Sequence, residues 1–108
     1  TRIALVDDIT KNIGLRSARL SYYIALDLIE EGNISEAINE FNYMLDGLEQ
    51  SYVDFGREQS TQYFMKVHSE NLSKIFYKLN NKKLLIDLKH LDPDNNKIYQ
   101  LYLDKIDK

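Results

Sequence analysis

Cysteine is absent from this chain of 108 residues, and proline occurs once. Without cysteine, the sequence excludes disulfides, thiolate catalysis and zinc sites with cysteine ligands. One proline and four glycines leave few helix breakers, which favours long helices over many short strands. The compartment stays open, with the cytoplasm favoured, because cysteine-free chains occur on both sides of a membrane.

Long apolar runs are missing as well. No stretch approaches the roughly 18 uninterrupted apolar residues of a membrane span. The start, "TRIALVDDIT", lacks the basic head and apolar stretch of a signal peptide. It also lacks methionine, so we expect a processed chain or a fragment of a longer one. The composition predicts a soluble globular protein, and the length suits one domain over residues 1–108.

An excess of basic charge is also missing: 14 lysines and arginines stand against 17 acidic residues, and the formal net charge is −3. This balance argues against a nucleic-acid partner, whose affinity comes largely from basic contacts to phosphate. Acidic residues gather between 27 and 54, and lysines gather between 66 and 89. The two groups fit solvated helix faces that attract each other, or a bipolar surface that orients a charged partner. An RNA-binding helical module that uses the lysine-rich segment is a third interpretation.

The clearest pattern that is present covers residues 34–55. Apolar side chains recur there at steps of three and four: Ile34, Ala37, Ile38, Phe41, Leu45, Leu48, Tyr52 and Phe55. This spacing predicts a helix with one apolar stripe. Asn33 and Glu36 form a pair typical of a capping box at its start, and Gly56 marks its end.

Further helices are predicted over residues 15–31, 64–79, 84–91 and 98–106, with a weaker helical segment at 2–13 that Gly14 ends. The helix at 15–31 carries a second apolar face of Leu20, Ile24 and Leu28, which predicts packing between two neighbours. No segment shows sustained alternation with period two. The sequence therefore predicts an all-α fold of antiparallel helical hairpins.

The stretch "ALDLIEEGNISEAINEFNYML" resembles a tetratricopeptide repeat. Ala25, Gly32, Ala37 and Phe41 carry the resemblance, together with Leu28. Small side chains let two helices approach closely, and glycine permits a left-handed turn that a β-carbon would penalise. A compact helical bundle with repeat-like spacing is the alternative fold.

The stretch "NLSKIFYKLNNKKLLIDLKHLDPDN" looks like a degenerate second copy, with Asn80 in place of the turn glycine. It departs from the family at Leu85, where a small residue is expected, and its second helix is about one turn short. Gly32 and Asn80 are also 48 residues apart, against about 34 between successive repeats of the family.

The resemblance implies a non-enzymatic scaffold that binds a protein or peptide on the first helix of each hairpin. It places Arg19, Tyr22, Leu26 and Glu30 on that surface from the first repeat, and Glu70, Lys74, Tyr77 and Lys78 from the second. The alternative function is a small helical inhibitor, immunity or regulatory protein that acts on one protein partner.

Residues typical of catalysis are sparse. His68 and His90 are the only histidines; we expect His68 at the edge of the core and His90 on the surface, because a metal site needs several convergent ligands. No glycine-rich phosphate loop or nucleophile motif is present. We therefore expect no enzyme activity, no metal and no cofactor. Eight tyrosines, all in predicted helices, suit interfaces or half-buried core edges.

Overall fold

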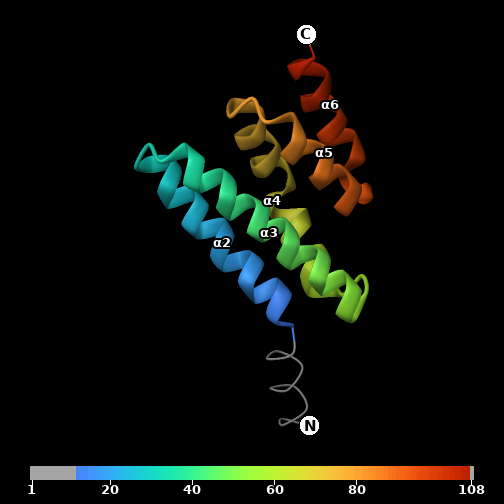
Figure 1. Cartoon of the computed structure of the whole chain (residues 1–108). Coiled ribbons are helices and arrows are strands. Elements are labelled where there is room, and N and C mark those ends of the chain that lie inside the picture. The colour runs from blue at the N-terminus through green and yellow to red at the C-terminus, as the bar shows by residue number, and fades with distance from the viewer. Residues whose placement is uncertain (1–11, 108) are drawn as a thin grey trace. The chain divides into compact units, whose positions relative to one another are not determined.

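The computed structural model describes residues 12–107, and every regular element within them is a helix (Figure 1). In chain order, the elements are α2 (Ile13–Glu30), α3 (Ile34–Phe55), α4 (Gln59–Lys78), α5 (Lys82–Leu91), the 3₁₀ helix η1 (Pro93–Asn95) and α6 (Asn96–Ile106). The all-α prediction is confirmed. Across residues 12–107, no helix is long and apolar enough to cross a membrane.

The start of α2 differs from the sequence prediction. Gly14 does not end a helix, because α2 begins at Ile13 and runs through it. The reason is the side chain of Asn12, whose Oδ1 accepts a hydrogen bond from the backbone N–H of Leu15 at 3.1 Å. This bond satisfies a donor in the first turn, so the helix starts one residue before the glycine. The rest of the predicted segment at 2–13 lies outside the described residues.

The chain divides into two compact units, Thr1–Glu58 and Gln59–Lys108, which we call the N-terminal and C-terminal units and describe separately. A single domain over residues 1–108 stays a prediction. In the N-terminal unit, α2 and α3 lie side by side and antiparallel as a hairpin (Figure 1). In the C-terminal unit, α4, α5 and α6 contact one another in pairs.

The turn of the N-terminal hairpin has the predicted left-handed residue. Gly32 has a φ of 81°, which glycine adopts without a steric penalty. The N–H of Gly32 donates to the carbonyl of Ile29, and the N–H of Asn33 donates to the carbonyl of Leu28. These two bonds make a Schellman motif, which satisfies the last carbonyls of α2 and turns the chain into α3.

The end of α4 repeats this motif. Asn80 has a φ of 54° and is the one non-glycine residue with positive φ in the described chain. Its N–H donates to the carbonyl of Tyr77, and the N–H of Asn81 donates to the carbonyl of Phe76. The prediction that Asn80 adopts a left-handed conformation is therefore confirmed.

The helix starts after these two turns are capped differently. Asn81 Oδ1 accepts from the N–H of Leu84 at 3.0 Å. Asn33 occupies the N-cap position of α3, but its side chain forms no cap hydrogen bond. The predicted capping box is thus wrong in its first half, and the turn before α3 depends on Gly32 rather than on the Asn33 side chain.

The two helices of the N-terminal hairpin meet through backbone at Gly14 and Gly47. A β-carbon at Gly47 would lie 2.6 Å from the carbonyl oxygen of Gly14 and 3.2 Å from the nitrogen of Ala18. A β-carbon at Gly14 would lie 2.5 Å from the carbonyl oxygen of Gly47. Both distances to oxygen are shorter than any tolerated contact, so only glycine fits either position. We call this contact the glycine seam.

The C-terminal unit buries polar side chains among its apolar ones. Asp92, which precedes η1, has only 2% of its surface exposed. Its Oδ2 accepts hydrogen bonds from the Tyr99 hydroxyl at 2.5 Å and from Asn95 Nδ2 at 2.7 Å. The bond to Tyr99 ties the end of α5 to α6, because Tyr99 belongs to α6. The Tyr99 side chain is itself fully buried. In α4, the Ser73 hydroxyl donates to the carbonyl of Ser69 at 2.8 Å.

Candidate functional site

The first predicted partner-binding set lies on α2. Arg19 and Glu30 are exposed, and Leu26 is half-buried. Tyr22 is only 3% exposed, and its ring packs edge-on against Tyr23 with 5.2 Å between the ring centres. The polar members of the set are thus available to a partner, whereas Tyr22 contributes to the core. Tyr23, which the prediction left out, is the exposed member of the aromatic pair.

The second predicted set lies on α4. Glu70 and Lys74 face each other in an exposed ion pair of 3.6 Å, and Lys78 is exposed. The Tyr77 ring lies 5.7 Å from the Tyr102 ring, and the Lys105 ammonium lies over both rings, at 5.9 Å and 4.9 Å from their centres. Because the two sets belong to different units, a single groove that joins them stays a prediction.

The outer face of α2 carries a row of exposed apolar side chains. Leu20 is 62% exposed, and Ile13 and Ile24 are exposed on the same side of the helix. Positions 13, 20 and 24 fall within about 40° of one another at the helical spacing of 100° per residue. This row corresponds to the second apolar face expected for residues 15–31, but two of its expected members, Leu20 and Ile24, are open to solvent. We call Ile13, Leu20 and Ile24 the outer row.

A groove runs along the glycine seam, beside the outer row. Its cavity measures about 650 Å³, and its lining residues are Ile13, Gly14, Ser17, Ser21, Tyr43, Asp46, Gly47, Gln50 and Asp54. The groove exists because the two glycines place no side chain along this part of the hairpin. We call it the seam groove.

The walls of the seam groove combine apolar and acidic groups. Ile13 on α2 is 68% exposed and Tyr43 on α3 is 60% exposed, so apolar surface stands on both helices. Asp46 and Asp54 are exposed on α3, and Asp54 accepts a hydrogen bond from Gln50 at 2.9 Å. Among the lining residues, all of them in the described part of the hairpin, none is basic. The groove therefore favours a ligand that is both cationic and partly apolar.

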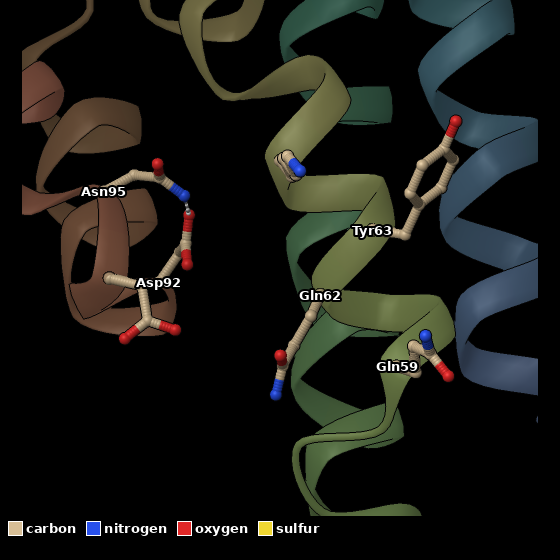
Figure 2. A pocket seen from close by; sticks show the side chains of 7 residues that line it. Gln59, Gln62, Tyr63, Asp92 and Asn95 are labelled. Carbon is tan, nitrogen blue, oxygen red and sulfur yellow. Dashed lines mark hydrogen bonds between the residues drawn. The ribbon is translucent and has the colours of Figure 1, made fainter.

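A second, more polar hollow lies in the C-terminal unit. It measures about 370 Å³ and is lined by Gln59, Gln62, Tyr63, Lys66, Asp92, Asp94 and Asn95. In Figure 2, Asp92 and Asn95 lie together on one side, joined by their hydrogen bond, and Gln62 extends from α4 on the other.

The Asp92 carboxylate in this hollow has a structural role. Asp92 is buried, and its Oδ2 already accepts two hydrogen bonds from protein donors. The arrangement holds η1 against α6, and we assign no reaction to it.

The histidines occupy the positions expected from the sequence. The ring of His68 packs on Phe64 with 4.7 Å between ring centres and is half-buried, and His90 is exposed. Within residues 12–107, no three acidic, histidine or cysteine side chains are grouped to hold a metal ion. The eight tyrosines all lie in helices, and Tyr23, Tyr43, Tyr63 and Tyr77 are exposed.

Neither the seam groove nor the outer row was predicted as a site. The residues that the resemblance implies lie on the other face of α2, and the sequence pattern predicts no role for Gly47. A signal was present, because a glycine inside an otherwise strong amphipathic helix often marks a close packing contact. No protein-family model, no curated protein and no solved structure matches the chain.

Proposed function

We propose that the chain is a non-enzymatic helical module, similar to tetratricopeptide repeats, that binds another protein or a peptide. The observation that carries this proposal is the exposed outer row on α2, with Tyr23 beside it, 57% exposed. Contiguous exposed apolar side chains on a folded surface mark interaction sites more often than chance. Aromatic side chains such as Tyr23 are enriched at the centres of protein interfaces.

Three features of the hairpin support the repeat-like part of the proposal. Gly32 turns the chain in a left-handed conformation, and Ala25 and Ala37 are fully buried, as is Phe41. Small residues followed by an aromatic one turn later are what the repeat family requires of two closely packed helices. Arg19 and Glu30, exposed on α2, would then supply polar contacts at the edge of the bound partner.

Affinity capture tests the binding function. The full chain is immobilised, exposed to extracts of its native host, and compared with the double variant Leu20→Glu, Ile24→Glu. We expect the variant to lose the captured proteins, because two charges in the outer row would have to be desolvated on binding.

A matched control places two glutamates on exposed apolar positions of the C-terminal unit, Val67→Glu with Leu101→Glu. The control should capture as much as the unchanged chain. Equal recovery by all three proteins would contradict the proposed role of the outer row. Circular dichroism of each variant ensures that a loss of capture does not reflect a loss of folding.

The second candidate is an inhibitor or immunity-type protein that acts on one partner. Its supporting observation is the charge of residues 12–58, where nine carboxylates oppose three arginines and no lysine, a formal −6. An acidic surface attracts a basic target and accelerates association at low ionic strength. A single dominant captured protein whose own activity falls when the chain is added would favour this candidate over a scaffold.

A further inference from the structure

We infer that the seam groove binds a basic segment of a partner protein that also carries an aliphatic side chain. The inference rests on the proposed binding function and specifies the site and the chemistry of the ligand. It differs from the surface that the repeat resemblance implies, because Ser17, Ser21 and Tyr43 line the groove and Arg19 and Tyr22 do not.

The shape of the groove sets the size of what can enter it. Gly14 and Gly47 form a stretch of bare backbone between α2 and α3. Ile13 lies at one end of this stretch, next to Gly14 on α2, and Tyr43 lies toward the other end, one turn before Gly47 on α3; both are largely exposed. An aliphatic side chain of a bound segment would contact one of these two residues, and a segment of several residues lying along the groove would contact both.

The charge of the groove selects the rest of the ligand. Asp46 and Asp54 lie on the same wall, from α3. Arg16 is not among the residues that line the groove. Residues 12–58 as a whole carry the formal charge of −6 described above. The electrostatic potential of the groove and that of the surrounding hairpin are therefore both negative. Lysine or arginine in the ligand would pair with the aspartates, and could also stack on the exposed Tyr43 ring.

The test is a selection of short random peptides on the immobilised full chain. Peptides that bind are then synthesised, and their affinities are measured by titration at low and at physiological salt. We expect the selected peptides to be rich in lysine or arginine around one or two aliphatic residues. Their binding should weaken as salt is raised, because exposed charge pairs are screened.

Two charge-matched variants locate the site. Asp46→Asn with Asp54→Asn removes two charges from the groove and should weaken peptide binding about fivefold, the effect of losing two exposed charge pairs. Glu31→Gln with Glu49→Gln removes two charges from exposed positions outside the groove. This control should bind within about twofold of the unchanged chain. Tyr43→Ala, at an exposed position, should also weaken binding while leaving the fold intact.

Each alternative outcome has a distinct meaning. If no peptide is selected and extracts yield no partner either, the binding function itself fails. If peptides bind but the two charge-matched variants weaken them equally, the groove assignment is overturned while the binding function stands. Acidic or uncharged peptides would overturn the ligand chemistry. If sedimentation shows a dimer that Asp46→Asn with Asp54→Asn dissociates, a second copy of the chain fills the groove, and the inference of a separate partner is wrong.

Discussion

The two units of the chain join their helices by opposite means. In the N-terminal unit, α2 and α3 approach closely because Gly14 and Gly47 have no side chains at their contact. In the C-terminal unit, hydrogen bonds connect the end of α5 to α6: the buried Asp92 carboxylate accepts from Asn95 and Tyr99. One contact is backbone against backbone, and the other is a polar network inside an apolar core.

The difference determines how each unit fails. A close backbone contact tolerates no added volume, because packed interiors have few voids to absorb it. A buried polar network tolerates added volume no better, but it is also sensitive to the loss of a single partner, which leaves a group desolvated without a hydrogen bond. The N-terminal unit should thus be damaged most by substitutions that add atoms at its seam, and the C-terminal unit by substitutions that remove hydrogen-bond partners.

The largest expected effect is one that the two units share. Phe41→Ala in α3 and Phe76→Ala in α4 each remove a ring that is fully buried. Each should lower the free energy of unfolding by about 3–5 kcal/mol, through lost transfer energy and the cavity that remains. Urea denaturation followed by circular dichroism measures this. A loss under about 1 kcal/mol at either position would mean that the unit is not packed as described.

The glycine seam gives the next prediction, in which packing and helix propensity oppose each other. In an exposed helix interior, replacing glycine by alanine stabilises by about 1 kcal/mol. At Gly47, the added carbon would lie 2.6 Å from a backbone oxygen, so Gly47→Ala should instead destabilise by about 1–3 kcal/mol. Ala37→Leu, at a fully buried position, should cost a similar amount. Thermal denaturation would show the sign directly.

The control for both substitutions is Asn39→Ala, at an exposed position of α3. It should change stability by less than about 0.5 kcal/mol. Stabilisation by Gly47→Ala would show that the seam is wider than described, and would remove the basis of the comparison between the units. If Ala37→Leu is as harmless as Asn39→Ala, the resemblance to a tetratricopeptide repeat is accidental and a simple bundle describes the hairpin better.

The polar network is tested by removing one partner at a time. Asp92→Ala leaves the buried Tyr99 hydroxyl without its acceptor and should cost about 1–3 kcal/mol of folding stability. Combining it with Tyr99→Phe removes the orphaned hydroxyl, so the double variant should regain part of that loss. A double-mutant cycle in urea gives the coupling between the two residues. Strict additivity would contradict the described hydrogen bond.

The smallest expected effects concern the helix caps. Asn81→Ala removes a side-chain bond to the Leu84 N–H and should cost about 1 kcal/mol. Asn33 makes no such bond, so Asn33→Ala should cost less than about 0.5 kcal/mol. Paired thermal melts of the two variants resolve the difference. Equal losses would indicate that the Asn33 side chain caps α3 after all.

Much of the helical architecture could be predicted from periodicity and turn chemistry. The helix at 34–55 has the predicted bounds, because its apolar stripe runs unbroken between Asn33 and Gly56. The left-handed residues at 32 and 80 were also predicted, since glycine and asparagine adopt that conformation most readily. Such features depend on a few adjacent residues, and local physics is enough to find them.

What could not be predicted depends on distant residues. Gly14 was expected to end a helix, because a glycine near a predicted boundary is usually a stop signal. Its actual role depends on Gly47, 33 positions along the chain, and nothing in the neighbourhood of either residue indicates the other. The hydrogen bond between Asp92 and Tyr99 could not be predicted either, because it depends on how the chain through η1 brings the two side chains together.

The reciprocal contact of Gly14 and Gly47 also constrains how such a sequence can drift over generations. In an ordinary core, a gain of volume at one position is compensated by a loss at its neighbour. Here neither glycine has a side chain that could become smaller, and the opposing atoms belong to the backbone, so no substitution can compensate for added volume. Alanine at either position would place a β-carbon against the backbone of the other helix, so the two helices would have to separate there at a cost in stability. The two glycines should therefore be inherited together, and the groove above them should keep one width.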